Sequence, residues 1–132
     1  YMADFWLLAY VEWYESDGQR DVEDALWTRP GVRTFLSRYS QKKIPIAKGQ
    51  MIGPATLIQA LNAYEYPIVD KEAVCQFISH SIQVQSELLS SISSEHIISL
   101  DEPSAFKTIE SKSLWEMIFK NKLKEKLGLK LD

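Results

Sequence analysis

Residues 70–92 read DKEAVCQFISHSIQVQSELLSSI, and they contain the longest regular pattern of core-type side chains in the chain. The side chains that keep this pattern are Val74, Phe77, Ile78, Ser81, Ile82, Gln85, Leu88, Leu89 and Ile92. They recur every three or four residues, which is the period of a helix with one face packed on a core. Asp70 precedes them and is one of the residue types that cap helix N-termini. The spacing therefore predicts a long helix over about 71–92.

Shorter helical patterns lie on both sides of this segment. Asp21 is a candidate cap for a helix that ends near Trp27, and Pro30 suits the first position of the next helix. Gly128 is a residue type that commonly follows a helix, and it marks the end of a last predicted helix near the C-terminal end of the sequence. The predicted shorter helices cover about 3–15, 22–27, 30–39, 54–64 and 113–127.

Two stretches between these helices have no helical period. Residues 40–53 include Pro45, which removes a backbone donor, so we expect a loop there with a short extended piece near Ile44. Residues 93–103 are rich in serine and predict an internal linker whose isoleucines lie against the body. The chain is therefore predicted to be all-α, a single compact bundle of five or six helices. Residues 1–132 form one helical domain in this prediction, either complete or part of a longer chain.

The composition is that of an ordinary globular domain. Of 132 residues, 45% are hydrophobic and 25% are charged, and fifteen are aromatic, which argues against disorder. The single cysteine, Cys75, excludes an internal disulfide and a zinc site built from several cysteines. No apolar run reaches the roughly 18 residues that span a bilayer, and the first residues lack the basic start of a signal peptide. We therefore expect an intracellular protein, cytoplasmic or nuclear, that is not secreted and does not insert into a membrane.

Charged residues are segregated along the chain. Residues 1–24 carry seven acidic side chains and one basic one, whereas residues 25–64 carry six basic side chains and no acidic one. The remainder carries eleven acidic and eight basic side chains, so the whole chain has a net charge of −3. Such asymmetry indicates an interaction surface or a complementary contact inside the fold.

The basic segment, residues 29–48, has three interpretations. Its cations can pair with the acidic first helices inside one fold, they can face an acidic partner protein, or they can bind phosphates of a nucleic acid. The first is the default, because the first 24 residues carry a complementary net charge of −6, although surface pairs of this kind are individually weak. The candidate contacts for an anion or a nucleic acid are Arg33, Arg38, Lys42, Lys43 and Lys48.

One part of this region resembles a DNA-binding motif. SQKKIPIAKGQMIGPATLIQAL, residues 40–61, resembles the start of the helix-turn-helix of phage-repressor-type domains. That motif needs a helix followed by a turn of three or four residues. Pro45 falls inside the would-be first helix, so the spacing argues against the motif.

Catalytic and metal-binding patterns are sparse. His80 has no carboxylate three or four residues away, and no H-x-x-x-H or H-E-x-x-H motif exists. Cys75 and His80 are five residues apart, so on a helix they project in different directions and do not form a nucleophile–base pair. We expect Cys75 to be a small buried hydrophobe. The sequence predicts a non-enzymatic protein without cofactor or metal.

Aromatic side chains supply candidate contacts for a partner. They are Trp6, Trp13, Trp115 and Phe119. The expected function is that of a helical protein–protein interaction module, an adaptor within a larger regulatory assembly. The alternative is a DNA- or RNA-binding domain that uses residues 29–48, and association with further copies of the chain is compatible with either.

Overall fold

The computed structural model of the chain describes residues 2–101. Each helix predicted before residue 93 is confirmed, with ends that agree to within two residues. The last predicted helix, 113–127, lies outside the described residues. The elements are α1 (Met2–Glu15), α2 (Val22–Trp27), α3 (Pro30–Tyr39), β1 (Ile44–Ile52), α4 (Pro54–Ala63), α5 (Lys71–Ser90) and β2 (Ser93–Asp101).

The prediction of an all-α bundle is wrong, because the described residues form a mixed α/β structure. Strand β1 occupies the predicted loop at 40–53, and strand β2 occupies the predicted linker at 93–103. The two strands pair in parallel, with register running from Ile44 opposite Ser93 to Ile52 opposite Asp101. Neither segment has the side-chain period of a helix, and each pairs its backbone with the other strand along one edge.

Pro45 does not prevent this pairing. A proline is tolerated on an edge strand where its missing N–H faces away from the neighbour, and β1 is paired on one side only among the described residues. Hydrogen bonds extend the ladder beyond both ends, from Ile44 N to Ile92 O at 2.9 Å and from Gly53 N to Asp101 O at 2.8 Å.

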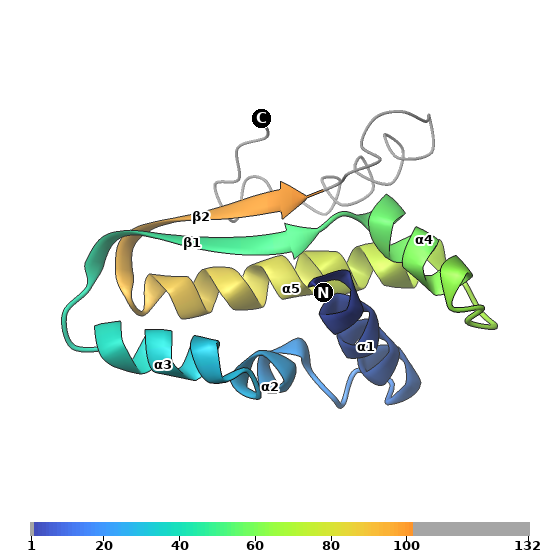
Figure 1. Cartoon of the computed structure of the whole chain (residues 1–132), viewed down its shortest axis with the longest axis horizontal. Coiled ribbons are helices and arrows are strands. Elements are labelled where there is room, and N and C mark those ends of the chain that lie inside the picture. Colours follow the sequence, from blue (N-terminus) through green and yellow to red (C-terminus); the bar gives the residue numbers. More distant parts are fainter. Residues whose placement is uncertain (1, 102–132) are drawn as a thin grey trace.

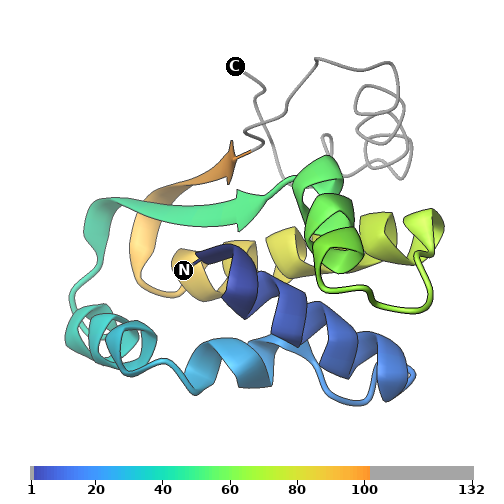
Figure 2. The ribbon, with the colours of Figure 1, turned by 45° about the vertical axis from the view of Figure 1, so that its right-hand side comes forward.

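Helix α5 is the central element. It runs along one face of the sheet. Helices α1, α2 and α3 lie on the side of α5 that faces away from the sheet (Figure 1). Helices α4 and α5 together connect β1 to β2, and the turned view shows α1 crossing in front of α5 (Figure 2). Asp70 caps α5, as predicted, by accepting a hydrogen bond from Ala73 N at 3.0 Å.

The predicted face of α5 is buried. Phe77, Ile78 and Ile82 are fully enclosed, and Ser81 donates its hydroxyl proton to the carbonyl of Phe77 at 2.7 Å. Gln85 is also buried, and its Oε1 accepts from Gln50 N of β1 at 3.3 Å. A polar residue is therefore tolerated in the stripe because it bonds the backbone of the sheet.

Gly49 allows α5 to lie close to β1. A methyl group at this residue would lie 2.9 Å from Oε1 of Gln85 and 3.0 Å from Cδ1 of Leu89. A larger residue at this position would therefore force the side chains of Gln85 and Leu89 to move.

The opposite face of the sheet is exposed at its centre. Ile46 and Ile97 are 55% and 56% exposed, and Lys48, Gln50 and Glu95 are exposed beside them. Within residues 2–101, no helix has the length and hydropathy required to cross a membrane.

Candidate partner-binding surfaces

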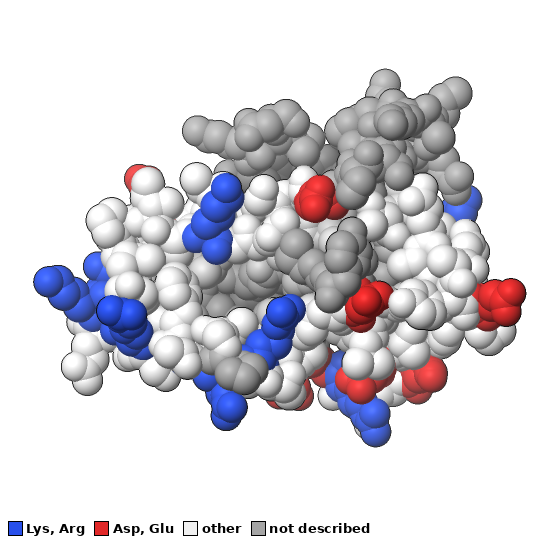
Figure 3. Space-filling view, viewed as in Figure 1, with Lys and Arg blue, Asp and Glu red and all other residues white. Residues whose placement is uncertain are grey.

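The basic segment is exposed rather than covered by the acidic helices. All six of its cations, from Arg29 to Lys48, are exposed, and none forms an ion pair with a carboxylate of residues 2–101. Figure 3 shows Lys and Arg gathered over the end that holds α3 and the start of β1, while most Asp and Glu lie toward the opposite end. Segregation of charge along the sequence is thus also segregation in space, and the expected internal pairing is not formed among the described residues.

An apolar groove lies beside these cations. It runs between α3, β1 and α5, has a volume of about 150 Å³, and is smaller than the roughly 300 Å³ at which small-molecule pockets begin. It therefore has room for one or two side chains of a partner. Its lining consists of Leu26, Val32, Phe35, Leu36, Lys48, Gly49, Gln85, Leu88 and Leu89.

Helix α3 contributes an incompletely buried stripe to this groove. Leu36 is buried, Val32 and Tyr39 are half-buried, and Phe35 remains 37% exposed. The ring of Phe35 packs edge-on against Tyr39, with centroids 5.2 Å apart. Phe35 has the spacing of a core residue, since it lies three residues after Val32 and four before Tyr39, but the groove leaves part of its surface in contact with water.

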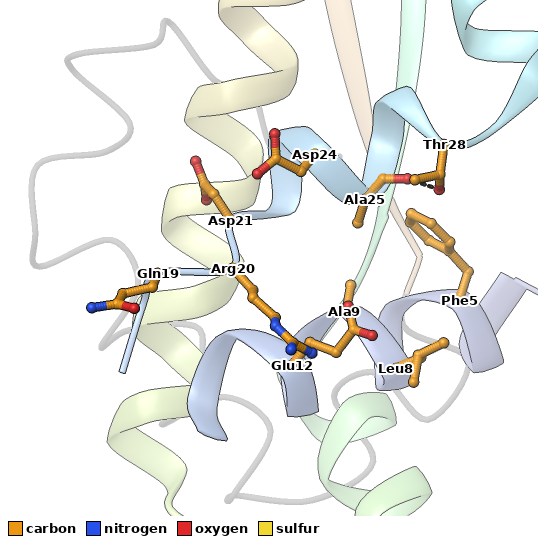
Figure 4. A pocket seen from close by; sticks show the side chains of 10 residues that line it. All are labelled: Phe5, Leu8, Ala9, Glu12, Gln19, Arg20, Asp21, Asp24, Ala25 and Thr28. Atoms are coloured by element: carbon orange, nitrogen blue, oxygen red, sulfur yellow. Dashed lines mark hydrogen bonds between the residues drawn. The ribbon is translucent and has the colours of Figure 1, made fainter. Parts of the chain in front are cut away.

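A second concave surface lies between α1 and α2 (Figure 4). This cleft has a volume of about 440 Å³. Three carboxylates and one guanidinium line it, so its surroundings favour a cationic group. Leu8 projects from α1 at this cleft and is 62% exposed. The lining consists of Phe5, Leu8, Ala9, Glu12, Gln19, Arg20, Asp21, Asp24, Ala25 and Thr28.

The candidate aromatic contacts lie in different places. Trp6 is 3% exposed and packs edge-on against Phe5, so it contributes to the core. Trp13 is half-buried against Phe77, with ring centroids 5.4 Å apart, and also lines a hollow near the start of α5. Trp115 and Phe119 lie outside the described residues.

His80 has a carboxylate partner that its neighbours in sequence did not reveal. Its Nε2 lies 2.6 Å from Oδ1 of Asp21, the residue that precedes α2. The same oxygen accepts a hydrogen bond from Val22 N at 2.8 Å. This contact fastens the start of α2 to α5, and the distance of 59 residues between the partners explains why no local motif predicted it.

A serine and a histidine also meet, at the junction of α5 and β2. Oγ of Ser86 lies 2.6 Å from Nε2 of His96, and Oγ of Ser90 lies 3.4 Å from its Nδ1. A nucleophilic serine needs access to substrate and a base that a third group orients. Ser86 is only 6% exposed and the second contact is long, so this pair is suited to joining β2 to the helix.

The thiol of Cys75 is part of the core. Cys75 is buried as predicted, and burial together with the charge of Glu72 raises the pKa of its thiol to about 11. Within the described part of the chain, no cluster of three or more His, Cys, Asp or Glu side chains is arranged to hold a metal ion.

Comparisons of the chain with protein-family models, with curated proteins and with solved structures return no match. The proposal of a function below therefore rests on the geometry of the described residues.

Proposed function

We propose that this domain is a protein-interaction module that binds an acidic, amphipathic segment of a partner along α3. The observation that supports it is the apolar groove between α3, β1 and α5, which has Lys48 in its lining and exposed arginines on α3. A partner that places an apolar side chain in the groove and carboxylates beside it satisfies both features.

The apolar contribution comes from Phe35 and the half-buried Leu88. Removing the exposed part of such surfaces from water favours association, and the affinity is the surplus over the freedom that the two partners lose. The charged contribution comes from Arg33 and Arg38 of α3, which steer an acidic partner and whose attraction is weakened by salt. Contacts of both kinds are required, because exposed cations alone give little net affinity.

The test uses a fluorescent synthetic peptide with leucines on one helical face and glutamates on the other. Its anisotropy should rise with protein concentration, and Phe35→Ala and Arg38→Glu should each weaken binding at least tenfold. Ile68→Ala and Arg20→Glu are matched controls, because both remove comparable exposed groups outside the groove. A wild-type protein that does not bind the peptide, or variants that bind as well as wild type, would contradict the proposal.

Nucleic-acid binding is the second candidate, and the exposure of the same cations favours it. Phosphate contacts release counterions, so binding must weaken steeply between 50 and 200 mM salt. An electrophoretic shift with single- and double-stranded DNA and RNA separates the two functions. Phe35→Ala should not affect a phosphate contact, whereas reversal of Arg38 should weaken it.

A further inference from the structure

Helix α1 presents a row of side chains with the chemistry that the α3 groove requires. Asp4, Leu8 and Glu12 are spaced four residues apart, so they lie along one side of the helix. Leu8 is the second most exposed of the large hydrophobic side chains described, and carboxylates lie one turn before it and one turn after it. At 1.5 Å per residue, the two carboxylates are about 12 Å apart along the axis.

The row and the groove are complementary in two respects. The groove has an apolar lining that includes the exposed ring of Phe35, and cations on α3 and β1 lie beside it. The row has an apolar side chain at its centre and negative charges at its ends. Neither surface has its charges neutralised by an ion pair within residues 2–101.

The two surfaces belong to different parts of the molecule. The groove is built from α3, β1 and α5, the row is on α1, and the groove shares no lining residue with the α1–α2 cleft where Leu8 and Glu12 lie (Figure 4). One molecule can therefore use its groove with one neighbour and its row with another.

We propose that the α3 groove of one molecule binds the Asp4–Leu8–Glu12 row of a second copy of this chain. The proposal rests on the proposed function, because it uses the same groove and names its partner. Such a contact is heterologous, since the two copies contribute different surfaces. A heterologous contact repeats from copy to copy, so it produces a ring or an open chain of molecules rather than a symmetric dimer.

Sedimentation velocity at a series of protein concentrations tests this pairing. The mass of wild-type protein should rise with concentration at low salt, and it should fall toward the monomer at high salt. Leu8→Lys, which disrupts the row, and Arg33→Glu with Arg38→Glu, which disrupts the groove, should each give a monomer. Ile68→Lys is the matched control for a lysine at an exposed apolar position and should associate like wild type.

An equimolar mixture of the two disrupted variants gives the sharpest result. The Leu8→Lys protein keeps an intact groove and the double variant keeps an intact row, so together they form one contact. The mixture should contain a dimer with one copy of each and nothing larger. A mixture that stays monomeric, or that grows beyond the dimer, would overturn the head-to-tail arrangement.

Self-association and peptide binding by the groove can be distinguished experimentally. A wild-type protein that remains monomeric at every concentration while its groove binds the acidic peptide would refute self-pairing and leave the interaction module intact. A protein that neither associates nor binds the peptide would refute both.

Discussion

Nε2 of His80 lies 2.6 Å from Oδ1 of Asp21, and this contact joins α5 to the residue at which α2 begins. Asp21 has two roles, because the same oxygen also accepts from the first N–H of α2. Helix α2 has only six residues, too few to be stable alone. Its position, and with it one wall of the α1–α2 cleft, is therefore set by this attachment together with the buried side chains of Val22 and Leu26.

Loss of Asp21 should cost more stability than loss of His80. Asp21→Ala removes both a cap and a partner, and should lower the free energy of unfolding by about 1–2 kcal/mol. His80→Ala leaves the cap in place and should cost about 0.2–1 kcal/mol, because the pair is partly exposed. A double-mutant cycle followed by urea denaturation measures the difference. Equal losses for the two single variants, with no coupling, would contradict this account.

Substitutions of two glycines should have opposite effects. Gly49→Ala places a methyl group 2.9 Å from Oε1 of Gln85, so the buried side chain of Gln85 must shift from its contact with Gln50 N, and stability should fall by about 1–3 kcal/mol. Gly31→Ala meets no atom within 4 Å and lies in the first turn of α3. It should be neutral or stabilise by up to about 1 kcal/mol, because alanine favours the helix. Thermal unfolding monitored by circular dichroism compares them, and a stable Gly49→Ala protein would mean that the strand and helix are less tightly packed.

Cys75 should make the protein less stable at alkaline pH. In the unfolded chain its thiol loses a proton near its ordinary pKa of 9.0, whereas burial raises the pKa in the folded protein to about 11. Between these values the folded state binds more protons, so stability falls as pH rises through this window, by up to about 3 kcal/mol. Urea unfolding at pH 8 and pH 11 should show a steeper loss for wild type than for Cys75→Ala. Rapid labelling of the native thiol by iodoacetamide at pH 8 would show instead that Cys75 is accessible.

The hydroxyl of Tyr10 should be dispensable for folding. The side chain is fully buried, and its hydroxyl has no hydrogen-bond partner within residues 2–101. Tyr10→Phe keeps the ring contacts with Trp13, Tyr14 and Phe77. Since it removes an unsatisfied polar group, stability should stay the same or rise by up to about 1 kcal/mol.

Loss of the whole ring in Tyr10→Ala should, by contrast, be strongly destabilising. That variant leaves a cavity in the aromatic cluster and should lose about 3–5 kcal/mol. Burial, with the charges of Tyr14 and Asp70, also raises the pKa of Tyr10, so Tyr10→Phe should be less sensitive to pH above about 10 than wild type. A large loss of stability in Tyr10→Phe would mean that its hydroxyl is hydrogen-bonded after all.

The candidate binding surface was predictable in part. The absence of carboxylates between residues 25 and 64 identified the cations that the structure leaves exposed on α3 and β1. The groove beside them was not predictable, because Leu88 and Lys48 approach Phe35 from elements distant in sequence. Phe35 has the spacing of a core residue within α3. Its partial exposure was not predictable, because it depends on how far the other elements cover α3.

By itself the sequence determined the five described helices, their ends and the buried face of α5. A helix is closed by hydrogen bonds between residues four apart, so its period, cap and end are all encoded within a contiguous segment. The parallel pairing of β1 with β2 and the contact between His80 and Asp21 were decided only by the tertiary structure. Their partners are separated by 49 and 59 residues, so each contact exists only when the folded chain places two distant segments side by side.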